Sequence, residues 1–309
     1  MYVFTRQKKI YGSLIAGLVM MALLVAGGFG CGAGTGEVDE ELVLTYQTWS
    51  ESLTIGNIFH ILLEEKTDIP IRAVELESFS IQWEAMIHDE VDILPSFTAS
   101  AYMNVLGDEG LRDPEEVYDY VSQRLEEEYN VILLEQLGYY NNYDLAVRPE
   151  VAEEYGLETY SDLAEVSDEL IITADANFLD IPAGYPLLQD VYGMDFKDIK
   201  TVGVALKYPV IEDGQADVIN NYTTDAQIVE LGLVVLEDDQ FAFPSYDAVP
   251  FVRKETLEKY PEIKEVLNLL AGQFSNDEMR EMNYRVEIDE EDPEDVARDF
   301  LIQKGLIGG

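Results

Sequence analysis

The chain has 309 residues, of which 47% are hydrophobic, so it can bury a sizeable core and is long enough for two domains. Its 62 acidic and 19 basic residues give a formal net charge of −43. This charge argues against nucleic acid as a partner, because phosphate contacts need a basic face. The apolar content is too high for a disordered chain. We expect a folded, halophilic protein, since molar salt shortens the Debye length to about 3 Å and screens self-repulsion.

The first residues have the pattern of an export signal. Basic residues between Arg6 and Lys9 precede an uncharged run over residues 10–36, so residues 1–31 are excluded from the fold. Cys31, the only cysteine, follows the apolar part of this run, which is typical of a lipoprotein signal whose thiol is lipidated after cleavage. The run is also long enough for an uncleaved membrane anchor. Either alternative predicts an extracytoplasmic chain tethered to the membrane, and a lone cysteine permits no internal disulfide.

Residues 32–41 are small, polar and acidic, which indicates a flexible tether. The folded part then begins with alternating apolar strands and helices. Ser50 is expected to cap the first helix, and Asp113 followed by proline is expected to begin a later one. We predict strands over residues 42–44 and 71–74, and helices over residues 55–63, 81–87 and 114–128.

The same alternation resumes after residue 140 and predicts an α/β fold. Strands are expected over residues 144–147, 170–173, 201–205 and 216–219, with a helix over residues 207–212. After a loop at residues 241–247, we predict mostly helix, the last one capped by Asp292. We place lobe one at residues 42–140 plus 243–309 and lobe two at residues 141–242, so the chain crosses between lobes twice.

Two stretches share one layout, namely residues 91–100 and residues 216–225. When Asp92 is aligned with Asp217, about 125 residues later, Phe97 stands opposite Tyr222. Each copy is expected to be a short buried strand that ends in an aromatic-Thr turn and leads into a helix. Ligands of open α/β sheets bind at the carboxyl ends of strands. A single copy would suggest a core aromatic, but the duplication favours two similar lobes that each offer a ring to a shared cleft.

Catalytic and metal chemistry find little support. His60 and His88 are the only histidines, and both lie in helical contexts without ligand spacing. The sequence contains no Gly-rich phosphate loop, nucleophile elbow or cysteine pair. The acidic run at residues 289–292 lacks the glycine of a Ca²⁺ loop and is expected to be a solvated face. We therefore predict neither an enzyme nor a metal site nor a cofactor.

Aromatic residues at turns are more informative, and the candidates are Phe97, Tyr143, Tyr222 and Tyr246. Rings that face inward from two lobes suit a cation that cannot donate hydrogen bonds. Each ring contact contributes about 0.5 to 2 kcal/mol, so three or four rings are enough for roughly micromolar binding. Closure of the lobes would remove water and strengthen the attraction.

Several motifs, in unbroken order from Leu42 to Ile307, resemble those of the substrate-binding proteins of ABC importers for glycine betaine, choline and related solutes. The resemblance implies a two-lobed periplasmic-binding-protein fold of type II that closes around its ligand. It also implies that the four aromatic candidates form a box around a trimethylammonium group. The matching motifs are Ser50-Glu51-Ser52, Val91-Asp92-Ile93, Phe97-Thr98, Asn141-Asn142-Tyr143, Gly184-Tyr185-Pro186, Tyr192-Gly193, Tyr222-Thr223-Thr224-Asp225, Phe243-Pro244-Ser245-Tyr246 and Met282-Asn283-Tyr284.

The chain departs from the family pattern at two positions. Phe97 stands where the family usually has Tyr, which keeps the π-face and loses a hydroxyl. Ile181 stands where some betaine-binding members have an Arg that clamps the carboxylate. Gln47, Thr98 and Ser100 are expected at the polar end of the ligand, and all three are neutral. Charge-assisted pairing is roughly twice as strong as neutral hydrogen bonding, so a carboxylate would be bound less tightly here. This favours a ligand without a carboxylate, such as choline.

The sequence thus predicts a monomeric extracytoplasmic receptor that captures a quaternary ammonium solute for an ABC permease in osmoprotection. Two alternatives remain open. One is a receptor of the same fold for an amino acid or a polyamine, which would need an arginine or paired carboxylates at the site. The other is a tethered extracellular hydrolase, against which the missing nucleophile motif argues.

Overall fold

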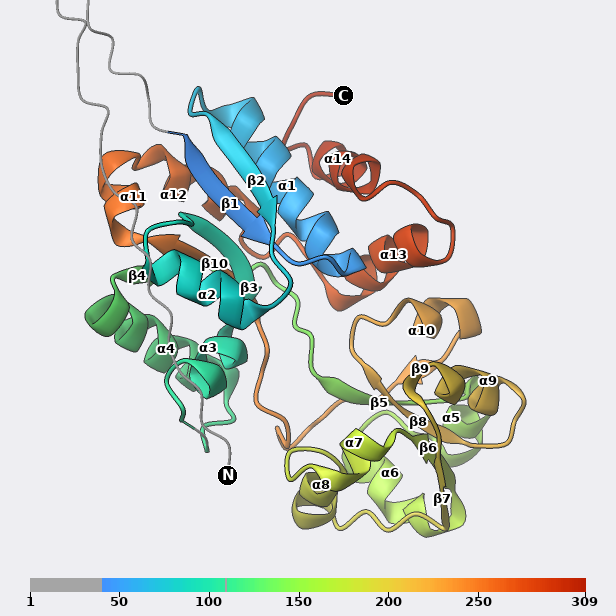
Figure 1. The fold of residues 1–309 in the computed structure, drawn as a ribbon. Coiled ribbons are helices and arrows are strands. Elements are labelled where there is room, and N and C mark those ends of the chain that lie inside the picture. The colour runs from blue at the N-terminus through green and yellow to red at the C-terminus, as the bar shows by residue number, and fades with distance from the viewer. Residues whose placement is uncertain (1–40, 109) are drawn as a thin grey trace, which may run out of the picture. The chain divides into compact units, whose positions relative to one another are not determined.

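The computed structural model describes residues 41–108 and 110–309, which contain two five-stranded sheets (Figure 1). The first sheet has the order β2-β1-β3-β10-β4. Strand β1 runs parallel to β2 and β3, and β10 runs antiparallel to β3 and β4. The strands are β1 (Leu42–Tyr46), β2 (Ile71–Glu75), β3 (Ile93–Phe97), β4 (Val131–Leu133) and β10 (Ala248–Arg253). The predicted strands at residues 42–44 and 71–74 are confirmed.

The chain after residue 247 is mostly helix, as predicted, but it begins with a strand, β10, that was not predicted. Its residues from Ala248 to Val252 are buried at the centre of the first sheet. Pro250 argues against a central strand in the sequence, because proline has no backbone N–H to donate. In the structure it faces Pro95 of β3, so a position without a donor meets another position without one.

The second sheet has the order β7-β6-β8-β5-β9. Strand β8 pairs parallel with β6 and antiparallel with β5. The strands are β5 (Tyr143–Val147), β6 (Ile171–Ala174), β7 (Asp198–Thr201), β8 (Val218–Tyr222) and β9 (Val234–Val235). The prediction of a strand over residues 201–205 is wrong, because β7 ends at Thr201 and a 3-10 turn, η2 (Val204–Leu206), follows Gly203.

The helices of the described chain begin largely where the sequence predicts. The side chains of Asp113 and Asp292 accept hydrogen bonds from the first backbone N–H groups of α4 and α14, as expected. Ser50 does not cap α1; it is the first residue of that helix, and its hydroxyl donates to Glu287. We call the part of the chain that carries the first sheet the first region, and the part that carries the second sheet the second region. The first region contains α1 (Ser50–Lys66), α2 (Phe79–Ile87), α3 (Thr98–Asn104), α4 (Pro114–Tyr129), α11 (Lys254–Lys259), α12 (Glu262–Leu267), α13 (Asn276–Glu287) and α14 (Pro293–Gln303). The second contains α5 (Pro149–Tyr155), α6 (Tyr160–Val166), α7 (Ala176–Asp180), α8 (Tyr185–Tyr192), α9 (Lys207–Glu212) and α10 (Ala226–Leu231).

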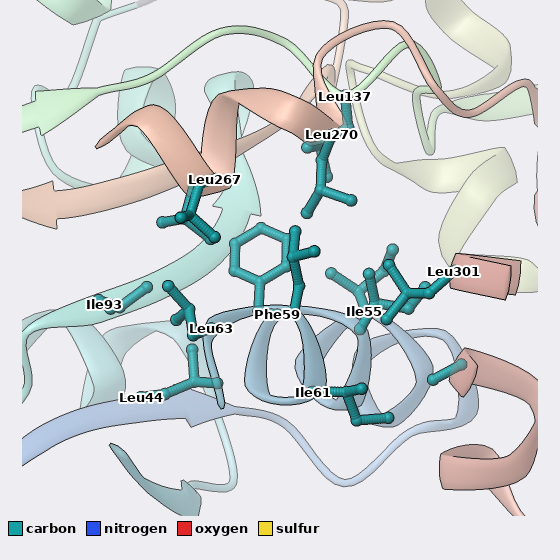
Figure 2. Close-up of a cluster of buried hydrophobic side chains, with 14 of the residues drawn as sticks. Leu44, Ile55, Phe59, Ile61, Leu63, Ile93, Leu137, Leu267, Leu270 and Leu301 are labelled. Atoms are coloured by element: carbon teal, nitrogen blue, oxygen red, sulfur yellow. The ribbon is translucent and has the colours of Figure 1, made fainter. Parts of the chain in front are cut away.

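Helix α1 is the centre of the largest apolar cluster. Figure 2 shows the Phe59 ring projecting from α1 toward Leu267 and Leu270, while Leu63 lies near Leu44 of β1. Phe59, Leu63 and Leu44 are fully buried, and each such side chain contributes about 1.5–3 kcal/mol through removal from water. This packing fixes the start of α1 at the carboxyl end of β1.

The duplicated stretches form corresponding strands, as predicted. Strands β3 and β8 each occupy the third place in their sheet. Asp92 accepts a hydrogen bond from the backbone of Val43, and Asp217 accepts one from the backbone of Ile171, at 2.9 and 3.0 Å. The two carboxylates are therefore structural. They tie the start of each strand to its parallel neighbour.

The duplication extends to a pair of arginines that the sequence analysis missed. Arg253 is the last residue of β10 and lies 3.5 Å from the Asp92 carboxylate, and Arg148 follows β5 and lies 2.8 Å from the Asp217 carboxylate. Both sheets therefore have the same construction at the start of the central strand.

Candidate ligand-binding site

The carboxyl ends of β3 and β8 carry Phe97 and Tyr222. On the antiparallel neighbour strands, Ala248 pairs with Phe97 and Tyr143 pairs with Tyr222. The segments that enter β5 and β10 also meet here, through a backbone bridge between Tyr140 and Asp247. Three of the four predicted box residues are thus placed by strand register, and the fourth, Tyr246, lies in the segment that enters β10.

Tyr143 and Tyr222, which we call the second wall, form a stacked pair with ring centroids 4.9 Å apart and planes inclined by 21°. The ring of Phe178 meets Tyr143 edge-on at 5.4 Å, and Asn177 donates to the Tyr143 hydroxyl at 3.2 Å. Tyr222 is 41% exposed, although most side chains of β8 are buried. Burial and the hydrogen bond with Tyr143 raise the pKa of Tyr222, so the hydroxyl stays neutral. The second wall is therefore an accessible, uncharged π-face.

Tyr246 lies close to the second wall. Its backbone N–H donates to the Asn142 side chain at 2.8 Å, and its hydroxyl lies 3.3 Å from the Met103 sulfur. Burial and the neighbouring Tyr143 raise the pKa of Tyr246. The three predicted tyrosines are therefore brought together.

A buried lysine lies beneath the second wall. Lys207 is 2% exposed, and its ammonium donates to the Asn220 carbonyl at 2.8 Å and to the Asp175 carboxylate at 3.4 Å. Burial raises the pKa of Asp175, but hydrogen bonds from Phe178 and Asn220 and the charge of Lys207 outweigh it, so the pKa lies below its usual range. Asp225 is a second carboxyl group at this end, and it accepts a hydrogen bond from the Tyr222 backbone at 2.9 Å.

Trp49, Phe97 and Tyr139, which we call the first wall, gather at the end of the first sheet. The Trp49 and Phe97 rings stack at 6.5 Å with planes inclined by 27°, and Tyr139 meets Phe97 edge-on at 6.3 Å. Within the described residues, Phe97 has no ring contact with the three tyrosines near the second wall. Neither Trp49 nor Tyr139 was predicted from the sequence. The signal for Trp49 was its place in the polar loop directly after β1, beside the end of β3.

The first wall borders a small hollow of about 20 Å³ that opens to solvent and is lined by Gln47, Trp49, Glu51, Ser52, Phe97 and Tyr139, among others. Gln47 is half-buried at its edge, and its backbone N–H donates to the Ser52 hydroxyl at 2.8 Å. Gln47 thus lies where a polar ligand group can reach its side chain.

Thr98 and Ser100, the other two predicted polar contacts, differ in exposure. Thr98 is fully buried, and its hydroxyl donates to the Ser245 carbonyl and accepts from the Asp247 N–H, at 2.9 and 3.2 Å. Its hydroxyl therefore holds the segment that carries Tyr246. Ser100 is half-buried in the first turn of α3.

The turn that follows Tyr222 is fixed by the first region. The carbonyls of Thr223 and Thr224 accept hydrogen bonds from Arg280 and Asn283 of α13, at 2.7 and 2.8 Å. The Thr223 hydroxyl donates to the Tyr140 carbonyl at 2.7 Å. Three motifs that lie far apart in the sequence, at residues 141–143, 222–225 and 282–284, therefore meet at one place.

The two histidines lie outside this site, each near a glutamate of its own helix, with His60 3.5 Å from Glu64 and His88 3.6 Å from Glu84. Ile181 follows α7 and is half-buried. Residues 41–108 and 110–309 contain no cluster of metal-ligating side chains and no helix long and apolar enough to cross a bilayer. Residues 1–40, which include the Cys31 and anchor predictions, lie outside the described chain.

Two sheets with aromatic side chains at the carboxyl ends of their central strands define a solute-binding protein with a two-lobed, type II periplasmic-binding-protein fold. The chain belongs to the family described as the substrate-binding domain of the ABC-type glycine betaine transport system, whose model matches residues 40–303. The resemblance predicted from the motifs is confirmed. Proteins of this family are extracytoplasmic receptors of ABC importers, which implies a small ligand and permease partners.

Known proteins with similar sequences differ in their ligands. The carnitine transport binding protein OpuCC of Listeria monocytogenes is 32% identical over 84% of this chain and 85% of its own length. The ergothioneine transport permease/ergothioneine binding protein EgtU of Helicobacter pylori is 31% identical over 97% of this chain and 54% of its own length. A crystal structure of a glycine betaine/carnitine/choline ABC transporter superposes with a TM-score of 0.82 at 29% identity, over 86% of this chain and 99% of that chain.

Proposed function

We propose that this protein captures a quaternary ammonium compatible solute outside the cell and delivers it to an ABC permease, so that the cell can balance external salt. The stacked pair of Tyr143 and Tyr222 supports this proposal most strongly. An accessible pair of neutral rings at a strand end offers no charge and few hydrogen bonds, which suits a methylated cation better than any donor-rich ligand.

Phe97, Tyr246 and the second wall are the proposed ring contacts for the trimethylammonium group. Each contact contributes about 0.5 to 2 kcal/mol, and more when closure removes water. Trp49 extends this set, because it stacks on Phe97 and is 38% exposed. The tryptophan ring attracts cations more strongly than the other aromatic rings do.

Gln47 and Ser100 are the proposed contacts for the polar end of the ligand, and Thr98 supports them through the segment that carries Tyr246. The apolar Ile181 cannot clamp a carboxylate, so choline competes well with the betaines. We infer that the chain binds without catalysing a reaction. It acts as a monomer held at the membrane through a lipid on Cys31 or through an N-terminal helix, with lobes divided near residues 140 and 243.

A thermal-shift panel in molar NaCl tests the proposal with glycine betaine, choline, carnitine, proline betaine, ectoine and ergothioneine, and with an amino acid and a polyamine for comparison. A ligand present at 100 times its Kd stabilises the folded protein by about 2.7 kcal/mol, which raises the melting temperature measurably. We expect shifts with ligands that carry a trimethylammonium group. No shift with any of them, together with a shift from an amino acid or a polyamine, would refute the proposed ligand class.

A further inference from the structure

Glu51 is a buried acid at the ligand site. It is the second residue of α1, its side chain is 1% exposed, and it lines the same hollow as Trp49 and Phe97. Among the residues that the structure describes, it has no ion-pair partner. Burial of an ionised carboxylate without a cation costs free energy, which favours the protonated form of Glu51. A positive charge placed nearby would favour the ionised form instead.

Every group that hydrogen-bonds to the Glu51 carboxyl is neutral. Asn141 donates to it at 3.3 Å from the segment before β5, and Asn283 donates at 3.2 Å from α13. Tyr139 and Thr224 are the other hydrogen-bonding neighbours. These donors offer dipoles and no charge.

The two arginines of α13 are engaged elsewhere, and Arg285 pairs with Glu291 and Asp299. Arg280, three residues before Asn283, donates to the Thr223 carbonyl at 2.7 Å and also to Asp277. Burial raises the pKa of Glu51 to about 7, and the donors only partly offset this rise. The empty protein therefore holds Glu51 partly protonated near neutral pH.

We propose that Glu51 is the counter-charge for the ligand's ammonium group, and that binding of this cation near neutral pH expels the proton that Glu51 holds in the empty protein. The carboxyl O–H bond breaks, the proton passes to solvent, and the carboxylate remains opposite the bound cation. The inference rests on the proposed function, because it needs a quaternary ammonium ligand beside the first wall.

The proposal fixes the sign of the pH dependence. A cation in the hollow favours the ionised carboxylate, so the pKa of Glu51 is lower with ligand than without. Affinity therefore falls as the pH drops below about 7, where the proton of the empty protein must be removed, and it levels off above that pH. A permanently neutral side chain at this position would remove the dependence.

The same carboxyl group links the two walls. Trp49 lies two residues before Glu51, and Thr224, which follows Tyr222 by two residues, is hydrogen-bonded to it. Hydrogen bonds to an ionised acceptor are stronger than those to a neutral one. Ionisation on binding would therefore strengthen the contacts that hold both aromatic walls in place.

Isothermal titration calorimetry of the full mature chain with choline and carnitine tests this, in molar NaCl at pH 7 and pH 9. Each titration is repeated in two buffers with different ionisation enthalpies, so that the difference in heat counts the protons released. We expect proton release at pH 7 and much less at pH 9, because burial raises the pKa of Glu51 to about 7 and the group is ionised well above that pH.

Glu51→Gln should abolish the release and weaken binding at pH 8 by about tenfold, since the counter-charge is lost. Asp144→Asn is the matched control. Asp144 is also buried with its pKa raised to about 7 by burial, but it bonds with Tyr160 and lies outside the hollow, so this variant should keep the release.

Ligand binding without proton release by the wild-type protein overturns the inference and leaves the proposed function intact, whether or not the variants fold. Release that persists in Glu51→Gln also overturns it. If neither quaternary ammonium compound binds, the proposed function and the inference fail together.

Discussion

The ends of the two sheets differ, although their beginnings are built alike. The first wall combines Trp49 and Phe97 with a buried acid, Glu51, that has no cation beside it within the described chain. The second wall stacks two tyrosines over a buried lysine, Lys207, that is neutralised by Asp175. The end of the first sheet thus has a buried acid whose hydrogen-bonding partners are neutral, and the end of the second sheet has a buried lysine paired with an acid. We infer that the first end responds to the ligand's charge, while the second is a rigid aromatic surface.

Removal of salt should have the largest effect, because it should unfold the protein and with it both ends of the site. The chain has 62 acidic and 19 basic residues, so its carboxylates repel one another when they are not screened. The Debye length grows from about 3 Å at 1 M to about 30 Å at 0.01 M salt, which removes this screening. We expect loss of far-UV circular dichroism on dialysis from molar to millimolar NaCl. An unchanged spectrum would refute the halophilic interpretation.

Replacing the two buried ionisable side chains, Lys207 and Glu51, by neutral ones should change the stability of the protein in different directions. Lys207→Met leaves the Asp175 carboxylate buried without its cation and should cost about 3–5 kcal/mol of stability. Glu51→Gln should instead leave the stability of the empty protein unchanged or raise it at pH 8. The folded pKa of Glu51 lies above its ordinary value of 4.5, so ionisation destabilises the fold as the pH rises from about 4.5 to 7.

Thermal unfolding in molar NaCl at pH 6 and pH 8, without ligand, measures both effects. If Lys207→Met proves as stable as the wild type, the ion pair between Lys207 and Asp175 does not stabilise the fold. A marked loss of stability in Glu51→Gln at pH 8 would mean that the ionised carboxylate stabilises the empty protein, which contradicts the contrast drawn here.

Tyr222→Ala should reduce ligand affinity at least tenfold, or about 1.4 kcal/mol, because it removes one π-face and the stacking partner of Tyr143. Tyr155→Ala is a matched control. It removes a half-buried tyrosine from α5, in the same region and away from the carboxyl end of β8. Calorimetry that shows equal affinities for the two variants would remove Tyr222 from the site.

Phe97→Tyr should have the smallest effect, a change in affinity within about threefold, because the π-face is kept. The variant restores the hydroxyl that relatives usually carry at this position. A gain of tenfold or more in calorimetry would show that the first wall binds through a hydrogen bond as well as through its rings.

Local sequence patterns predicted the framework well. The layout of residues 91–100 and 216–225 identified β3 and β8 and their aromatic ends, and acid-proline pairs identified the starts of α4 and α14. These features depend on neighbours in the sequence. The family resemblance supplied Tyr143 and Tyr246, which the strand pattern alone gave only as turn aromatics.

The buried ionisable groups that distinguish the carboxyl ends of the two sheets, Glu51 and Lys207, could not be predicted from local sequence patterns. One residue in five is acidic, so nothing in the sequence marks Glu51 as the acid that is buried. The partners of Lys207 lie 32 and 13 residues away, and the donors to Glu51 lie 90 and 232 residues away. Strand β10 was missed because Pro250 is tolerated only through its register with Pro95, which only the assembled sheet reveals.

The most direct test of the central claim compares choline with its uncharged isostere, 3,3-dimethylbutan-1-ol, by calorimetry in molar NaCl. The two ligands share shape and hydroxyl and differ only in the charge of the central atom. Because several rings and one carboxylate attract that charge, we expect choline to bind at least about thirtyfold more tightly. Equal affinities would show that the site holds its ligand by shape and burial alone, and would contradict the account.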